Sequence, residues 1–205
     1  MSAGDDEEER CKRTELVVLQ AVRLKGRVSR DDLAATLDDD VSDAVNRLVE
    51  AGLLVDGPAL RVSPDGRSRL NELLADERSR IDVDALSAAY NEFRSVNSDF
   101  KALVTDWQLR HGQPNPHDDA DYDAAVLARL DEVHRRVTPL VFAAAAELPR
   151  LARYSAKLQT ALDRVHAGET MWLSRPLIDS YHTVWFELHE ELILAAGLTR
   201  EAEDA

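Results

Sequence analysis

The sequence predicts a mainly α-helical protein, with an N-terminal winged helix-turn-helix that carries a small β-hairpin wing and a C-terminal all-α domain like a four-helix bundle. Apolar residues recur every three or four positions over most of the chain, as on one face of a helix. One stretch, "LLVDGPALRV", instead has two short apolar runs around Asp-Gly-Pro, which favours a hairpin. Beyond residue 80 no alternation typical of strands occurs, so long helices are expected there.

These patterns divide the chain into three parts. Residues 1–9 are acidic and polar and are expected to form a disordered tail. Residues 10–80 are expected to form the winged-helix domain, and residues 82–200 an all-helical domain for dimerisation or effector binding.

The first helices of the N-terminal domain have clear end signals. Apolar residues with helical spacing run from Leu16 to Leu24, and Gly26 ends the pattern. Ser29 is placed to cap a second helix, with Asp32 three residues later as the acidic member of a capping box.

A third helix follows a run of aspartates, and Gly52 ends it. Val41, Val45, Leu48 and Val49 share its apolar face. After the hairpin, "SPDGRSRLNELL" begins a fourth helix, with serine as the cap and proline at the first helical position. The order helix, helix, helix, hairpin, helix is that of a winged helix-turn-helix.

The residues themselves carry a family resemblance over roughly residues 15–75. The stretches "VSRDDLAATL", "VSDAVNRLVEAGLLV" and "LRVSPDGRSRL" resemble the DNA-binding region of MarR-like bacterial winged-helix regulators. The resemblance implies the winged-helix fold and DNA binding, although winged helices also serve as protein-interaction modules.

The C-terminal part is expected to hold four helices. The first carries an aromatic-rich stripe and ends at the loop "RHGQPNPHDDADYD". The second runs over about residues 121–147, with a kink or break expected at Pro139. The third lies between Pro149 and Gly168, and the fourth is expected to start at Pro176. Four helices with modest loops favour a bundle or a dimerising domain.

Charge and cysteine content exclude several classes of protein. The net charge is −14, and both parts are acidic: residues 1–80 hold 13 Lys and Arg against 18 Asp and Glu, and residues 81–205 hold 12 against 21. DNA contact must therefore come from a local patch. Cys11 is the only cysteine, which excludes a disulfide framework and a multi-cysteine zinc site and fits a cytoplasmic location. The acidic N-terminus and the lack of a long apolar run predict neither secretion nor a membrane partner.

A DNA-reading helix would use the polar residues near the start of the third helix. Ser42, Asn46 and Arg47 are expected to approach bases. Phosphate contacts are expected from three arginines on the wing and after it: Arg61, Arg67 and Arg69. The neighbouring run Asp38 to Asp40, together with Asp43, opposes this interpretation, because carboxylates repel phosphates. A winged helix used for protein contact is the alternative.

The stretch "DSYHTVWFELHEEL" places histidines and carboxylates on one helix. Asp179 precedes His182 by one turn, and Asp131 precedes His134 by one turn on another helix. Two such pairs can converge on a metal, but partly buried histidines in a packed face explain the pattern more simply. Some bacterial regulators join a winged helix to a helical domain with an acidic residue and three histidines around a metal. The layout is similar, but the histidines do not align, so no metal ligand or cofactor is assigned.

A small-molecule pocket in the helical domain is a second interpretation of these residues. Asn97 is a polar residue at a core position, where it either fixes helix register or faces a ligand. The residues expected to line such a pocket are Asn97, Trp107, Tyr154, His182, Trp185 and His189.

The sequence contains no phosphate-binding glycine loop, nucleophile elbow or His-Glu-x-x-His motif, so no catalytic residue is assigned. The expected function is a homodimeric, DNA-binding transcriptional regulator whose helical domain dimerises or senses a small-molecule effector. The alternative is a protein-interaction module or regulatory subunit that binds a protein partner. A metal binder or enzyme that uses His182 and His189 is the third hypothesis.

Overall fold

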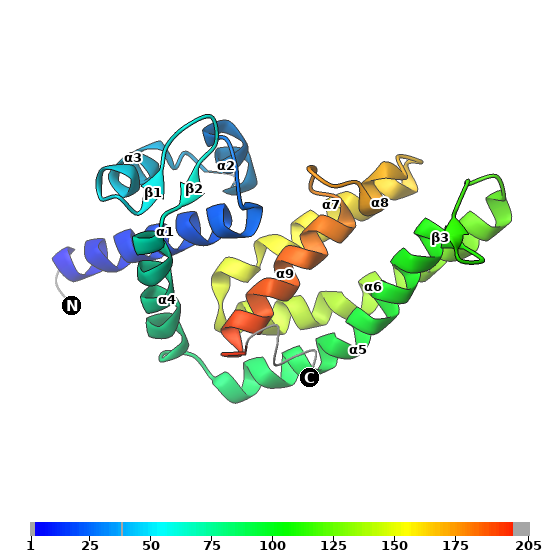
Figure 1. Cartoon of the computed structure of the whole chain (residues 1–205). Helices are drawn as coiled ribbons and strands as arrows, with labels where there is room; N and C mark the ends of the chain where they lie inside the picture. The colour runs from blue at the N-terminus through cyan, green and yellow to red at the C-terminus, as the bar shows by residue number, and fades with distance from the viewer. Residues whose placement is uncertain (1–2, 38, 199–205) are drawn as a thin grey trace. The chain divides into compact units, whose positions relative to one another are not determined.

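A computed structural model describes residues 3–37 and 39–198, with side chains from residue 6 onward. This part of the chain is mainly helical, as predicted, and its strands form two small two-stranded sheets. The chain divides into two compact units, Met1–Arg80 and Ile81–Ala205. Each unit is described by itself (Figure 1).

The first unit has the predicted order of elements. Three helices precede a hairpin and a fourth helix follows it: α1 (Ala3–Lys25), α2 (Arg30–Leu37), α3 (Ser42–Glu50), β1 (Leu54–Val55), β2 (Arg61–Val62) and α4 (Pro64–Arg78). Helix α1 begins inside the segment that we expected to be a disordered tail.

Short-range signals set the helix ends in this unit. The Asp32 backbone N–H donates to Ser29 Oγ at 3.1 Å, so Ser29 caps α2 as predicted. Ser63 caps α4 in the same way by accepting from the Gly66 N–H at 2.9 Å, and Pro64 occupies the first turn.

The hairpin is attached to the helices through Val28, which lies outside the two strands. β1 and β2 pair antiparallel, with Leu54 opposite Val62. Outside these strands, Val28 forms a β-bridge with Leu60, and each of the two residues donates its N–H to the other's carbonyl. Because Val28 lies between α1 and α2, this bridge ties the hairpin to the start of α2.

The second unit consists of long helices with short connections. Two small strands interrupt the helical order: α5 (Val83–Gln108), β3 (Leu109–Arg110), β4 (Gln113–Pro114), α6 (Ala120–Glu147), the 3-10 turn η1 (Pro149–Leu151), α7 (Arg153–His166), α8 (Met171–Ser174) and α9 (Tyr181–Ala195). In Figure 1, α5 and α6 run side by side along most of their length, and α9 lies beside α7.

The hairpin between α5 and α6 was not predicted, because a loop was expected there. Its two central residues, His111 and Gly112, have φ values of 54° and 75°. Two-residue type I′ turns need positive φ at both positions, and glycine adopts it without steric cost. The sequence signal is therefore only the dipeptide His-Gly between very short strands, which is too weak to distinguish a hairpin from a loop.

Two further expectations concerned prolines, and the one about the start of the last helix was wrong. Helix α6 continues through Pro139 without a break, since proline removes one backbone donor but neighbouring turns and tertiary packing maintain the helix. The last helix starts at Tyr181 and not at Pro176. Ser180 supplies its cap by accepting from the Thr183 N–H, which fixes the start five residues later than proline alone suggested.

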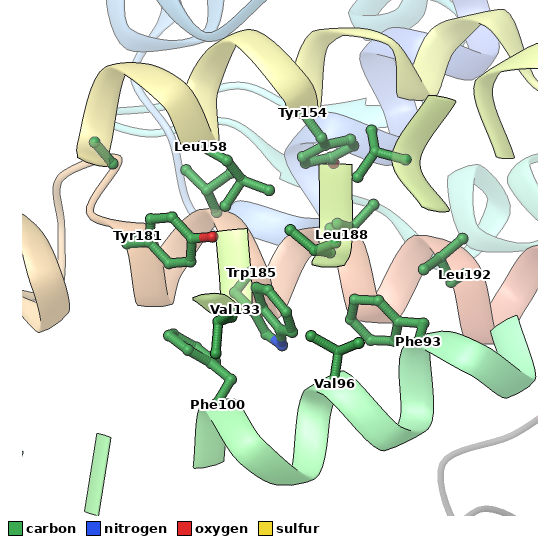
Figure 2. Close-up of a cluster of buried hydrophobic side chains, with 14 of the residues drawn as sticks. Phe93, Val96, Phe100, Val133, Tyr154, Leu158, Tyr181, Trp185, Leu188 and Leu192 are labelled. Atoms are coloured by element: carbon green, nitrogen blue, oxygen red, sulfur yellow. The ribbon is translucent and has the colours of Figure 1, made fainter. Parts of the chain in front are cut away.

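The core of the second unit lies between α5, α6, α7 and α9. Figure 2 shows Trp185 of α9 reaching toward Phe93, Val96 and Phe100 of α5, with Tyr154 of α7 on the other side of α9. The rings of Phe100 and Trp185 are 4.4 Å apart between centroids. Among the described helices, none is both long enough and apolar enough to cross a membrane.

Candidate functional site

Helix α3 buries one face and exposes the other. Ala44, Val45 and Leu48 are buried against the rest of the first unit, while Ser42 and Asn46 are exposed. The periodicity of about 3.6 residues per turn explains this split, because the buried positions recur every three or four residues. The exposed face is the surface on which base-reading residues were expected.

Asn46 is held by Arg30, an arginine that was not among the predicted contact residues. Arg30, at the start of α2, donates from Nη1 to Asn46 Oδ1 at 3.0 Å and from Nη2 to Asp56 Oδ2 at 2.9 Å. Arg30 thus links α2, α3 and the loop of the hairpin. Its hydrogen bond, followed by that of the Gly57 N–H, lowers the pKa of Asp56.

Arg47 lies beside a hollow next to α1 and not beside Arg30, which contacts Asn46. It lines a hollow of about 190 Å³ with Cys11 and Glu15 of α1 and with apolar residues of α3. Residues 46 and 47 are adjacent on a helix and so project about 100° apart. The helix therefore presents these two predicted contact residues in separate directions.

The three arginines that were expected to contact phosphates do not all lie in one place. Arg61 and Arg67 line a second hollow, of about 510 Å³, between the end of α1, the hairpin and the start of α4. Arg69 does not join them. Its guanidinium makes two hydrogen bonds to the carboxylate of Glu15, at 2.9 and 3.1 Å, and a longer one to Glu72. Arg69 thus joins α4 to α1, which gives it a structural role.

Carboxylates surround the exposed face of α3. Asp39, Asp40, Asp43 and Glu50 are all exposed. Asp40 accepts from the Ser42 N–H at 3.0 Å, and hydrogen bonding by Ser42 lowers its pKa. Asp38, also part of this run, lies outside the described residues. The surface around α3 is therefore acidic, apart from Arg30 and Arg47.

In the second unit, Asn97 and Trp185 bind each other. The indole N–H of Trp185 donates to Asn97 Oδ1 at 2.9 Å, and both side chains are buried. This hydrogen bond joins α5 to α9 and satisfies the polar atom of the tryptophan. It corresponds to the expected role of Asn97 in fixing how the helices pack.

Tyr154 belongs to a buried ionic cluster that the sequence did not indicate. Its hydroxyl donates to Glu191 Oε1 at 3.3 Å, and the Glu191 side chain has no solvent exposure. Arg150 and Arg153 form ion pairs with the same carboxylate. Burial raises the pKa of the Tyr154 hydroxyl, so the residue acts as a neutral donor.

Two of the remaining predicted pocket residues lie beside rings of α5 that also contact Trp185. His189 is buried, with its ring 5.3 Å from that of Phe93, and Phe93 in turn lies 5.0 Å from Trp185. His182 is exposed beside Phe100, and partial burial of its ring lowers its pKa. Trp107 packs at the other end of α5, its ring 4.4 Å from that of His117. Asn97, His182, Trp185 and His189 are thus linked through the rings of Phe93 and Phe100, whereas Tyr154 belongs to the ionic cluster and Trp107 lies beside His117.

The two Asp-x-x-His pairs do not converge. Asp131 accepts from His166 at 2.8 Å, whereas His134 contacts Gln159 and the Tyr181 hydroxyl. Asp179 binds Lys157 at 2.8 Å. In the part of the chain that the structure describes, no group of three or more His, Cys, Asp or Glu side chains could hold a metal ion.

An Asp-His pair of a different kind occurs at the end of the unit that carries β3 and β4. His117 Nδ1 lies 2.9 Å from Asp123 Oδ2, and Asn115 donates to the same carboxylate and to the Trp107 carbonyl. The backbone N–H of His117 donates back to Asn115. These bonds close the loop before α6.

Searches among known protein families, curated proteins and solved structures find no match to this chain.

Proposed function

We propose that this protein is a DNA-binding transcriptional regulator, in which the first unit is a winged helix and the second unit pairs two copies of the chain. The main support is the arrangement of α2 and α3, which are four residues apart in the chain, both contact α1, and are followed by a hairpin that is tied back to Val28. In winged-helix proteins the second of these helices enters the major groove.

The polar face of α3 supplies chemistry suited to bases. Since Arg30 occupies Asn46 Oδ1, the free part of the Asn46 side chain is its amide N–H group. This group can donate to a base-edge acceptor such as guanine N7 or O6, or thymine O4. A bidentate contact to adenine, which uses both the oxygen and the nitrogen of asparagine, would require Arg30 to move away.

Unpaired arginines supply the phosphate contacts in this proposal. Within the described residues, Arg47, Arg61 and Arg67 have no ion pair or side-chain hydrogen bond, so their guanidinium groups are available to phosphates. Arg69 is left out of the contact set because Glu15 holds it. Arg30 joins the set, since exchanging Asp56 for a phosphate keeps its charge paired.

The second unit suits pairing of two copies. Its four long helices share one core, which we interpret as a four-helix bundle. Phe142 on α6 is 59% exposed, and Leu177 is fully exposed with a left-handed φ of 69°. Regulators of this class read paired half-sites as two-fold dimers, and in this proposal the second copy covers these two side chains. A small-molecule effector that favours one packing of these helices would alter the spacing of the two α3 helices.

Selection of bound sequences from a pool of random duplex DNA tests the proposal. The full chain is incubated with the pool at low and at physiological salt, and the retained DNA is sequenced. We expect enrichment of a two-fold symmetric sequence at both salt concentrations. Arg47→Ala should weaken binding to that sequence by about 1–3 kcal/mol, if Arg47 reads a base or phosphate directly.

Arg13→Ala is the matched control, because Arg13 is an exposed arginine of α1 that lies outside the proposed contacts. It should leave the selected sequence and its affinity almost unchanged. If no sequence is enriched, or if DNA is retained only at low salt, the protein does not read bases and the proposal is wrong.

The acidity around α3 favours a second candidate, a winged helix that binds a basic protein partner. The triple variant Asp39→Asn, Asp40→Asn, Asp43→Asn separates the two. If the protein binds DNA, removal of carboxylates near the phosphates should strengthen DNA binding and leave the sequence preference unchanged. For a basic protein partner, the same variant should remove the electrostatic attraction and weaken capture of the partner.

A further inference from the structure

The hollow that contains Arg61 and Arg67 is lined by cationic side chains, although the chain as a whole is acidic. It is formed by the end of α1, the hairpin and the first turn of α4, all within the first unit. Arg23 of α1 also lines it, and its Nε donates to Gln20 Oε1 at 3.1 Å. Three arginines thus line one hollow of about 510 Å³.

No carboxylate is among the residues that line this hollow in the described part of the chain. In a protein with a net charge of −14 this is unusual, because acidic side chains outnumber basic ones in the first unit as well. Like charges gathered at one place repel one another. An anion bound between Arg61 and Arg67 would remove that repulsion.

The other walls of the hollow are apolar. Val22 of α1 and Val55 and Val62 of the hairpin contribute apolar surface beside the arginines. Ligand pockets commonly have volumes of about 300–1,000 Å³ and combine apolar walls with a few polar groups. The volume here exceeds what a free phosphate ion fills, and leaves room for an apolar group next to the charged one.

We propose that this hollow binds a small organic phosphate, with the phosphate group held by Arg61 and Arg67 and an apolar body against the valines. Arginine suits this role because its planar fork of N–H donors matches phosphate oxygens in a bidentate way. The site uses two of the arginines proposed for DNA contact but does not depend on DNA binding.

Isothermal titration of the full chain with phenyl phosphate tests this inference. We expect saturable binding that is tighter than that of inorganic phosphate, because only the ester has an apolar body. The double variant Arg61→Gln, Arg67→Gln should weaken binding by about tenfold or more. The control Arg13→Gln, Arg94→Gln removes the same charge from exposed arginines elsewhere and should leave binding unchanged.

Three results would overturn the proposal: absence of saturable binding, equal affinity for inorganic phosphate and phenyl phosphate, or an equal loss in both double variants. A fourth arm uses a short duplex DNA of arbitrary sequence as competitor. Displacement of phenyl phosphate by this duplex, together with equal affinity for phenyl phosphate and inorganic phosphate, would assign the hollow to backbone phosphates and reject a small-molecule ligand. Binding of phenyl phosphate that persists in the presence of the duplex supports the small-molecule site and removes Arg61 and Arg67 from the proposed DNA contacts.

Discussion

Asn97 and Trp185 are separated by 88 residues, and a buried hydrogen bond of 2.9 Å joins them. Asn97 comes from the middle of α5 and Trp185 from α9, so the bond fixes the position of one helix against the other. A tryptophan in a core needs a partner for its indole N–H, because an unsatisfied buried donor costs free energy.

Asn97→Leu should therefore destabilise the second unit, since it leaves the Trp185 N–H buried without an acceptor. We expect a loss of about 1–3 kcal/mol in the free energy of unfolding, measured by urea denaturation. The double variant Asn97→Leu, Trp185→Phe removes both partners and should recover part of this loss relative to the sum of the single changes. Additive effects would mean that the hydrogen bond contributes nothing.

Any side chain at position 66 should clash with the backbone of the first unit. A Cβ atom at this position would lie 2.0 Å from the carbonyl oxygen of Leu53, which belongs to the backbone and cannot rotate away. Gly66→Ala should therefore lower stability by about 3 kcal/mol or more. Gly57→Ala is the control, because its Cβ would meet only the Ala59 carbonyl oxygen, at 3.9 Å. Thermal unfolding that is equal for the two variants would contradict the close contact.

Glu191 should be sensitive to loss of its charge. Its buried carboxylate pairs with Arg150 and Arg153, so Glu191→Gln leaves buried guanidinium groups without a counterion. Breaking a buried pair from one side costs about 3–5 kcal/mol. The exposed pair of Glu132 with Arg135 provides the control, and Glu132→Gln should change stability by less than about 1 kcal/mol. Chemical denaturation of both variants compares the two sites directly.

The histidines of the second unit predict that stability falls in mild acid. Burial lowers the pKa of His134 and of His182 below the ordinary value of 6.5. Above pH 6.5 these histidines are mainly neutral in both the folded and the unfolded protein. As the pH falls from 6.5 toward the lower pKa of the folded state, the unfolded chain binds the proton first and stability decreases.

Replacing both histidines by glutamine should therefore reduce the loss of stability between about pH 7 and pH 5. His111→Asn is a suitable control because His111 is exposed in the β3–β4 turn. Melting temperatures recorded across this pH range give the comparison. A double variant with an unchanged pH profile would show that these two side chains do not control acid sensitivity.

Local sequence signals were sufficient for most of the helical framework. Ser29 and Ser63 cap the helices that they were predicted to cap. Val41, Val45 and Leu48 are buried as expected, while Val49 is half-buried. Capping and amphipathic periodicity act over three or four residues, so neighbouring residues contain the information. The β3–β4 hairpin was missed because its strands are only two residues long.

The pairing of polar side chains was decided by tertiary structure. Arg69 was expected at a phosphate and is bound to Glu15, 54 residues earlier, while Asp131 binds His166 and not His134. The sequence determined which residues lie on exposed or buried helix faces. Which charged groups meet depends on the contacts between those faces, because an ion pair needs atoms within about 4 Å and helix spacing alone does not fix that distance.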